Sequence, residues 1–467
     1  MGLPPVLGRA SVKDRMGSPV SVRFISWNCC AVFDDNKLDT LESWIRLENP
    51  WIQNDAVDFD VVVVRSRGVP RPFVPVSACL SVPSGGASST CARRLPLMQF
   101  HFQEVGGKTK NLAMLGGVEA TLLSCFPDFW NSGMIIETNT KGPRFTALAT
   151  IAFIRHAVLP RCSIWEWEAP PEECSMTEAS SMGGKWIAAK DVARGAPGVP
   201  SWVRCVKFPS EVPARKGCQF FKMLIDSTDF LLVNLHNFHD ESNLEAYSDS
   251  EDGSDYSQKR RATLGILSNW LHLVAHERAF VFGDFNFRLE LKYALHWLCT
   301  RCIDPELIKT HASADIRVSA FREKDKIKIC VTTGADEAPI EMGAIGKKTF
   351  GMAIGEQRLT DEVHLHKHGL AAFDHEMLRY NAFAAATPGV GTCLHELPRE
   401  FPPTYPWCEH SGDYLNTRFP AWCDRVLMTD AARSMVLQTY YTYTSAHRPL
   451  VTGDHKPVML QFGVHPT

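Results

Sequence analysis

The sequence predicts a layered α/β fold, mainly because of the order of its apolar segments. Residues 260–278 have apolar side chains at helical spacing, whereas other segments are rich in the β-branched and aromatic residues typical of buried strands. These strand candidates are 22–30, 58–64, 145–156, 221–240 and 278–290. Strand, helix and strand follow one another along the chain, which favours sheets covered by helices.

The composition is that of a soluble globular protein. The chain has 467 residues, a formal net charge of −3, 45% hydrophobic residues and 22% charged residues. This near-neutral balance argues against binding of nucleic acid through a strong basic field, although a local basic pocket can still receive a phosphorylated small molecule. No apolar run is long enough to cross a bilayer, so we expect no transmembrane segment.

One catalytic domain with insertions accounts for the length of the chain. We expect a flexible N-terminus at 1–21 and a catalytic domain at 22–463. Residues 65–98 are rich in proline, serine and glycine, which predicts a disordered insertion. The apolar segments on its two sides would join into one strand if it were deleted. A second, helical insertion is expected at about 301–395.

Two polar residues follow apolar segments in a way that suits a cation site. Asn28 stands in "SWNCC" and Glu104 in "FQEVGG", each where a strand would deliver its side chain to one rim of the sheet. Oxygen ligands of this kind suit a hard divalent cation. Taken alone, each residue is more often a surface amide or acid.

Two further blocks end predicted strands with groups suited to phosphate chemistry. In "VNLHNFHD", His236 can donate to a phosphoryl oxygen, although a lone histidine there is more often structural. In "VFGDFNFRLE", Gly283 permits a tight strand exit, and strand alternation places Asp284 and Asn286 on the same side, facing one ligand. The alternative is a turn in which these two side chains merely satisfy backbone amides.

The fifth block joins "PAWCDRVL" with "TGDHKPV" and contains Asp424, Arg425, Asp454 and His455. An Asp-His pair before a strand can place a carboxylate and a phosphate donor side by side, whereas Asp424 and Arg425 can equally form a structural ion pair. Metal-assisted phosphate hydrolysis needs carboxylates, an oriented water and donors around the phosphoryl oxygens. The five blocks together supply groups of the kind that this chemistry needs.

These blocks resemble the signatures of the inositol polyphosphate 5-phosphatases. The signatures W/F-x-G-D-x-N-x-R and P-A/S-W-C-D-R-V/I-L stand here as "FVFGDFNFR" and "PAWCDRVL". The resemblance runs from about Val22 to Phe462, and "RKG", "NLHNFHD", "SNL" and "FPPTYPW" look like the type I enzymes. It implies the DNase I-like endonuclease/exonuclease/phosphatase fold, a sandwich of two sheets flanked by helices with the site at one rim.

The resemblance also implies a Mg²⁺ cofactor, held by Glu104 with help from Asn28. Asp284 is expected to activate or orient the attacking water, and Asn286 to hold it with the scissile phosphate. The remaining catalytic side chains, expected to stabilise the phosphate or to complete the acidic rim, are His236, Asp424, Asp454 and His455. Those expected to bind the other substrate phosphates or to shape the site are Lys216, Arg288, Tyr405, Arg418 and Arg425.

The expected substrates are soluble inositol 1,4,5-trisphosphate and 1,3,4,5-tetrakisphosphate, whose hydrolysis would terminate calcium-mobilising signalling. We expect no nucleic-acid partner and no C-terminal prenylation, since the last cysteine is Cys423, and a location in the cytoplasm or peripheral at the plasma membrane. Two alternatives remain open. One is a phosphodiesterase or nuclease of the same fold, and the other is an inactive inositol phosphate-binding scaffold, suggested by the insertion before Glu104.

Overall fold

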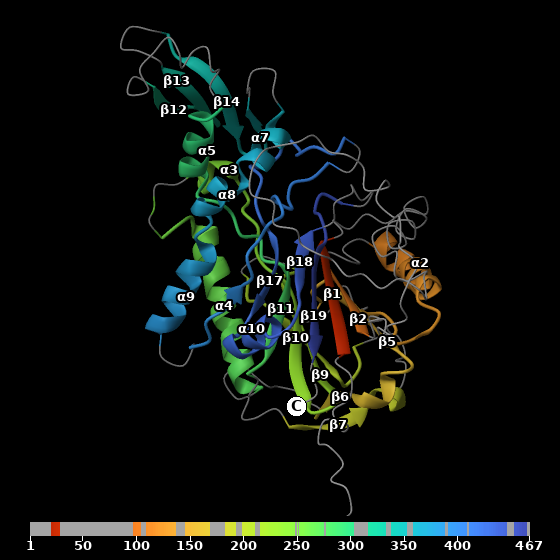
Figure 1. Cartoon of the computed structure of the whole chain (residues 1–467). Helices are drawn as coiled ribbons and strands as arrows, with labels where there is room; N and C mark the ends of the chain where they lie inside the picture. The colour runs from red at the N-terminus through yellow and green to blue at the C-terminus, as the bar shows by residue number, and fades with distance from the viewer. Residues whose placement is uncertain are drawn as a thin grey trace, which may run out of the picture.

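The computed structural model describes most of the chain from Val20 to Val464. The described residues are 20–28, 97–103, 109–136, 145–168, 183–192, 199–210, 215–247, 250, 252–274, 277–302, 316–332, 338–352, 358–387, 391–408, 411–445 and 453–464. The predicted strand at 58–64, nearly all of the predicted insertion and most of the predicted N-terminal segment lie outside them. Two large sheets form the body of the molecule, and a smaller sheet projects from one end (Figure 1).

The first sheet has seven strands and contains both ends of the described chain. Its strands in spatial order are β18 (Thr442–Ser445), β19 (Val458–Val464), β1 (Val20–Asn28), β2 (Leu97–Gln103), β5 (Ala149–Arg155) and β3 (Phe129–Asn131), and β4 (Ile135–Ile136) also pairs with β5. Strands β1 and β2 are parallel, so they end at the same edge of the sheet. Helix α2 (Thr109–Cys125) follows β2 along the chain.

The second sheet has eight strands. In order they are β16 (His395–Glu396), β17 (Asp424–Met428), β11 (Ala279–Asp284), β10 (Thr228–His236), β9 (Gly217–Ile225), β6 (Cys162–Trp167) and β7 (Gly184–Ala188), and β8 (Val203–Lys207) pairs with β9. Strand β11 lies parallel to β10 and antiparallel to β17. The predicted strand at 221–240 is therefore wrong in extent, because a turn at Asp226 and Ser227 divides it into β9 and β10.

The two sheets pack face to face through aromatic side chains. Phe24 of β1 lies against Phe280 and Phe282 of β11, with ring centroids 6.0 and 4.8 Å away. Val281 faces the other way, into the layer that includes Leu267 of helix α4 (Asp255–Leu273). Because both faces of β11 are covered, every residue of this strand is buried and its sequence is almost entirely apolar.

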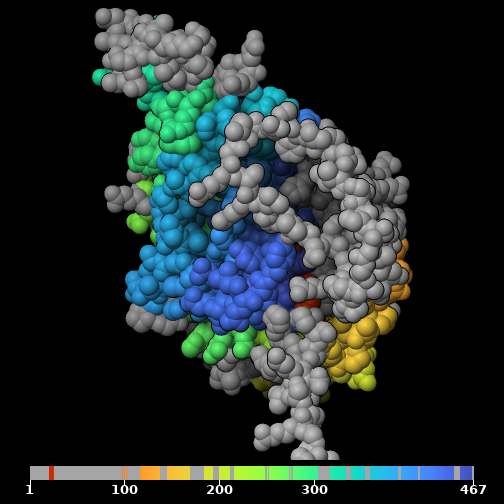
Figure 2. All heavy atoms as spheres, in the orientation of Figure 1, coloured from red at the N-terminus to blue at the C-terminus, as the bar shows by residue number. Residues whose placement is uncertain are grey.

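Helices cover the outer face of the second sheet. Helix α4 begins at Ser254, whose hydroxyl accepts from the Ser257 N–H at 3.2 Å, and α9 (Glu376–Ala386) lies beside it. The other α-helices are α3 (Asn243–Ala246), α5 (Leu291–Cys299), α7 (Leu359–Leu365), α8 (Lys367–Leu370) and α10 (Asp430–Leu437). Figure 2 shows the atoms of the C-terminal third gathered on one face of the molecule. No helix in the described parts of the chain has the length and apolarity to cross a membrane.

The third sheet corrects the prediction of a helical insertion at about 301–395. Its four antiparallel strands are β12 (Arg317–Glu323), β13 (Lys326–Thr332), β14 (Ile340–Gly346) and β15 (Phe350–Met352), and helices follow only from α7 onward. Alternating segments such as "KIKICV" are short, and their strand period is masked by the helical pieces that follow. The predicted α/β sandwich itself is confirmed.

Register places three polar residues in one row across the second sheet. His236 at the end of β10 pairs with Asp284 at the end of β11, and Asp284 pairs with Asp424 at the start of β17. One step earlier, Gly283 pairs with Leu235 and has a φ of 150°. A Cβ atom on Gly283 would lie 1.9 Å from the Leu235 carbonyl oxygen, so only glycine permits this approach of the strands.

We therefore expect Gly283→Ala to lower the free energy of unfolding by about 3 kcal/mol, because backbone must move to relieve the clash. Urea unfolding measures the change. Gly351→Ala is the matched control, since Gly351 also lies in a strand but has no atom within 4 Å of the added Cβ. Equal, small effects of the two substitutions would contradict this role of Gly283.

Candidate active site

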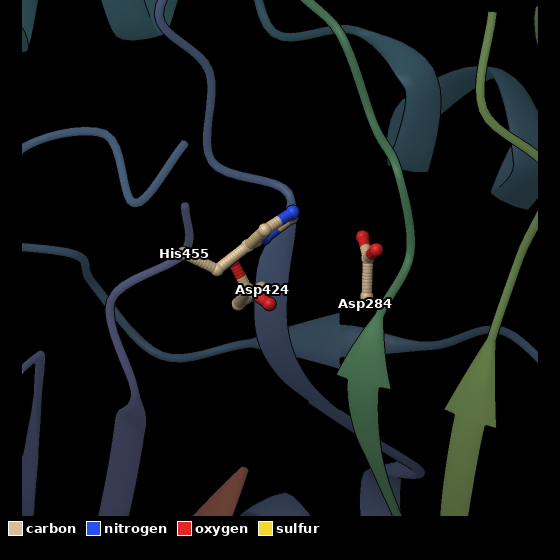
Figure 3. Close-up of side chains that lie close together, drawn as sticks. All are labelled: Asp284, Asp424 and His455. Atoms are coloured by element: carbon tan, nitrogen blue, oxygen red, sulfur yellow. The ribbon is translucent and has the colours of Figure 1, made fainter. Parts of the chain in front are cut away.

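Four of the predicted catalytic side chains meet at the end of the second sheet. Figure 3 shows Asp284 at the tip of β11, with Asp424 and His455 beside it. One potential ligand atom from each of these three buried residues lies within 4.8 Å of the others. His236 joins them from β10, with its Nε2 3.4 Å from Asp284 Oδ2. The strand ends therefore converge as the sequence predicts.

Asp424 holds His455 through a short hydrogen bond. The distance from Asp424 Oδ2 to His455 Nδ1 is 2.8 Å, and the Thr404 hydroxyl donates to the same oxygen at 2.7 Å. Burial opposes a charged ring, but the carboxylates of Asp424 and then Asp284 outweigh it and raise the pKa of His455 to about 10. The imidazole is therefore held as an imidazolium at neutral pH.

Asp284 stays ionised despite its burial. Burial alone would raise its pKa, but the charges of His455, His236 and Lys216 lower the pKa well below its usual range. The ammonium of Lys216 contacts His236 Nε2, so this lysine, which was expected to bind substrate, lies against a histidine that was predicted to be catalytic. Two buried carboxylates are thus balanced by cations in the same small volume.

Asn286 reaches Asp284 through a tight turn. β11 ends at Asp284, and Asn286 has a φ of 53°. The Asn286 backbone N–H donates to Asp284 Oδ1 at 2.8 Å, and Asn286 Nδ2 donates to Asp284 Oδ2 at 2.9 Å. The predicted strand alternation is therefore wrong for this pair, and the turn considered as the alternative describes the local structure. The carboxylate and the amide nevertheless stay together.

Arg288 and Tyr405 pack beside His455. The ring centroids of Tyr405 and His455 are 4.4 Å apart, and Arg288 Cζ lies 4.5 Å from the Tyr405 centroid. Arg288 Nη2 donates to Asn286 Oδ1 at 2.9 Å. The guanidinium is therefore fixed next to the turn that holds Asp284.

A buried ion-pair network supports Arg288 and Arg418. Arg260 pairs with Asp240 at 3.0 Å and with Glu376 at 2.5 Å. Asp240 Oδ2 lies 3.5 Å from Arg288 Nε, and the Asp240 carbonyl accepts from Arg418 Nη2 at 2.8 Å. Helices α4 and α9, which carry Arg260 and Glu376, thereby fix side chains at the site.

Arg425 does not join the substrate-binding residues in this structure. Its guanidinium is 1% exposed and pairs with Asp374 at 2.6 Å and Glu396 at 3.2 Å. Its Nε donates to the Trp422 carbonyl at 2.7 Å. Arg425 therefore forms the structural ion pairs that the sequence left open as an alternative, although its partners are Asp374 and Glu396 rather than Asp424.

The predicted metal ligands follow the parallel strands of the first sheet. Asn28 ends β1 and pairs in register with Gln103, the last residue of β2. Glu104 comes next in the chain but lies outside the described residues, and so does the side chain of Asn28. Gln103 Nε2 donates to Asn234 Oδ1 of β10 at 2.8 Å, which links the two sheets near this edge.

The donors at the site fit a hard divalent cation. Carboxylate oxygens of Asp284 and Asp424 lie together, and Asp424 Oδ1 is buried with no hydrogen-bond partner in the described part of the chain. Magnesium and calcium prefer such oxygen ligands, whereas zinc prefers nitrogen and sulfur. Asp454 is more peripheral, with a 26% exposed side chain whose Oδ1 lies 3.9 Å from His455 Nε2.

Two residues at the site received no role from the sequence. Thr404 donates to Asp424, and Asn243 accepts from Arg418 Nη1 at 2.7 Å. They stand in "FPPTYPW" and "SNL", segments that the resemblance to type I enzymes had already singled out. The signal was present, but short polar residues give no individual clue to their partners.

Comparisons with known proteins show the family of this chain. A sequence model of the endonuclease/exonuclease/phosphatase family 2 matches residues 386–461. Inositol polyphosphate-5-phosphatase A of Canis lupus familiaris is 31% identical over 391 residues, covering 79% of this chain and 84% of that protein. The chain belongs to the inositol polyphosphate 5-phosphatases. It is therefore a hydrolase that acts on phosphate monoesters, as the sequence predicts.

Other relatives of this phosphatase agree with the assignment. Human inositol polyphosphate-5-phosphatase A is 30% identical, again over 79% of this chain and 84% of the relative. A Caenorhabditis elegans protein named probable type I inositol 1,4,5-trisphosphate 5-phosphatase is 28% identical, over 78% of this chain and 90% of that protein. The matches thus extend well beyond the two short signatures.

Substitution of Arg418 and substitution of Arg425, both in the "NTRFPAWCDR" segment, should affect stability differently. Arg425→Met should lower the free energy of unfolding by about 3 kcal/mol or more, because buried Asp374 and Glu396 lose a partner. Arg418→Met should change it by about 1 kcal/mol, because this side chain is half-buried. Urea unfolding of both variants tests the difference, and a stable Arg425→Met protein would contradict the structural role.

The charge on His455 predicts a pH-dependent contribution to stability. Because the pKa of His455 rises from 6.5 to about 10 on folding, its stabilisation is complete below pH 6.5 and is lost as the pH rises towards 10. The difference in unfolding free energy between wild type and His455→Gln should therefore shrink over that interval. Urea unfolding across this pH range tests it, and a constant difference would contradict the assignment.

Proposed function

We propose that this protein uses Mg²⁺ to hydrolyse the 5-phosphate of soluble inositol polyphosphates, namely inositol 1,4,5-trisphosphate and 1,3,4,5-tetrakisphosphate. The observation that carries the proposal is the row of His236, Asp284 and Asp424, joined by His455. The name of the Caenorhabditis elegans relative supports the choice of the trisphosphate. A location in the cytoplasm or at the plasma membrane stays a prediction.

The two histidines suit the charge that develops on the phosphoryl group. His455 is held as an imidazolium, and His236 lies against the Lys216 ammonium. In phosphoryl transfer, negative charge is spread over the equatorial oxygens, so fixed donors and cations stabilise the transition state. His236 ends β10, and His455 is held by its hydrogen bond to Asp424 at the start of β17, which limits the reorganisation needed during reaction.

Asp284 is placed to orient the attacking water. Its lowered pKa makes it a weak proton acceptor but a permanent negative charge, and two hydrogen bonds from Asn286 fix its carboxylate. A loose phosphoryl transition state requires mainly that the nucleophile be positioned in line with the leaving oxygen. Asn286 and Asp284 together perform this positioning, and no covalent intermediate is required.

A hard cation completes the site. When bound by Glu104 and Asn28, Mg²⁺ would neutralise charge on the phosphate and on the leaving inositol oxygen. Asn28 ends β1 and Glu104 comes directly after β2 in the chain, and these two parallel strands end at one edge of the first sheet.

The remaining substrate phosphates have cationic and hydroxyl partners beside the row. Arg288 lies over the Tyr405 ring, which packs against His455, and Arg418 lies close enough to Arg288 and Tyr405 to interact electrostatically with both. Guanidinium groups match phosphate oxygens in a bidentate geometry, and a fixed guanidinium loses little entropy on binding. A substrate with several phosphates on one ring would use this group for positioning.

We expect purified protein with Mg²⁺ to release the 5-phosphate of inositol 1,4,5-trisphosphate, leaving inositol 1,4-bisphosphate. Asp284→Ala should lower kcat by about a hundredfold or more, because the water loses its orienting group. Phosphate release and chromatographic identification of the product measure both effects. EDTA should abolish turnover if the cation is required.

Asp229→Asn is the matched control, because Asp229 lies near the start of β10, at the end remote from His236, and pairs with Arg278 at 3.0 Å. It should retain wild-type kcat. Loss of a phosphate other than the 5-phosphate would refute the substrate assignment. Binding without turnover by folded wild type would instead identify a scaffold, and cleavage of DNA would identify a nuclease.

A further inference from the structure

The third sheet is attached to the active site through one buried asparagine. Asn243, in the "SNL" segment, is 3% exposed and begins α3. Its backbone N–H donates to the Lys347 carbonyl at 3.0 Å, and its Nδ2 lies 3.3 Å from the Gly346 carbonyl oxygen and 3.1 Å from that of Thr349. The turn between β14 and β15 is therefore fixed by its backbone. Figure 1 shows β14 running from the projecting sheet towards α3.

The same asparagine holds the arginine expected to bind substrate. Asn243 Oδ1 accepts from Arg418 Nη1 at 2.7 Å, and Asn243 Nδ2 lies 2.9 Å from the Thr417 carbonyl oxygen. The Phe350 N–H donates to the Asn416 carbonyl at 3.2 Å, which adds a second link between the turn and the Arg418 segment. The turn and Arg418 therefore form one fixed unit.

The turn that Asn243 links to Arg418 carries two exposed lysines. Lys347 and Lys348 are both exposed, and none of the residues that the structure describes forms an ion pair with either. Lys326 at the start of β13 is also exposed and pairs in register with Gly346. The acid Glu341 of β14 instead pairs with Lys328 at 3.6 Å. Exposed lysines on a turn with a fixed backbone make a positive surface suited to phosphate.

We propose that Lys347 and Lys348 form a second phosphate-binding element, held by Asn243 against Arg418, that binds a substrate phosphate remote from the reaction. Asn243 is then a positioning residue for both cationic groups. This inference rests on the proposed substrate class. Because the backbone of the turn is fixed before binding, the lysines lose less conformational freedom than lysines on a mobile loop.

The test is equilibrium binding of inositol 1,4,5-trisphosphate in EDTA, so that affinity is measured without turnover. Lys347→Ala/Lys348→Ala should raise the Kd about five- to twentyfold, the range expected for the loss of charged phosphate contacts. With Mg²⁺ present, KM should rise similarly while kcat stays within about twofold, because the reacting phosphate is untouched. The control is Lys185→Ala/Lys190→Ala, two exposed lysines at the opposite end of the molecule, near β7 (Figure 1).

Asn243→Asp separates the two functions of the asparagine. Aspartate keeps an acceptor for Arg418 but cannot donate to the Gly346, Thr349 and Thr417 carbonyls, so its Kd should rise at least as much as that of the double lysine variant. If the lysine substitutions leave the Kd unchanged, or if the control pair raises it equally, the inference is wrong. The inference is also wrong if the double lysine variant binds inositol 1,4,5-trisphosphate with an unchanged Kd but no longer sediments with anionic phosphatidylserine vesicles. That result would assign the lysines to a lipid surface.

These outcomes are distinct from failure of the proposed function. Wild type that hydrolyses the 5-phosphate while the lysine variant binds normally would refute only the lysine site. Wild type that binds through the lysines without releasing phosphate would refute only the proposed catalysis. Wild type that neither binds nor hydrolyses the trisphosphate would refute both.

Discussion

The active site depends on the register of β10, β11 and β17. Pairing of His236 with Asp284, and of Asp284 with Asp424, sets three functional groups side by side at one edge of the sheet. A shift of one residue in either pair would turn the side chains of a strand to the opposite face. Gly283 favours this register, because only a residue without a Cβ can approach the Leu235 carbonyl so closely.

Charge balance is the second condition for such a site. Two carboxylates that are almost fully buried would repel each other and take up protons unless cations lay close to them. His455 supplies one charge through its bond to Asp424, and Lys216 adds another beside His236. The arrangement keeps Asp284 ionised and His455 protonated, the states that the proposed water orientation and phosphate stabilisation require.

Apolar strands that end in polar residues leave a strong local pattern, which predicted the layered α/β fold and the converging strand ends, whereas the two-sheet sandwich was predicted from the resemblance to the family. The sequence pattern failed for Asn286, since a residue in a tight turn reaches its neighbour by backbone geometry that periodicity does not encode. It left the role of Arg425 open, because a signature motif does not show whether a guanidinium faces substrate or a buried carboxylate. The contacts of Asn243 join segments far apart in the chain, which no local pattern reveals.

The central claim is that the 5-phosphate lies in the row formed by His236, Asp284 and His455. A crystal structure of the protein with Mg²⁺ and the 5-phosphorothioate analogue of inositol 1,4,5-trisphosphate tests it most directly. We predict that the thiophosphate lies between the two histidines and that Glu104 and Asn28 face the cation. A different phosphate in this row, or a cation bound without Glu104, would contradict the account.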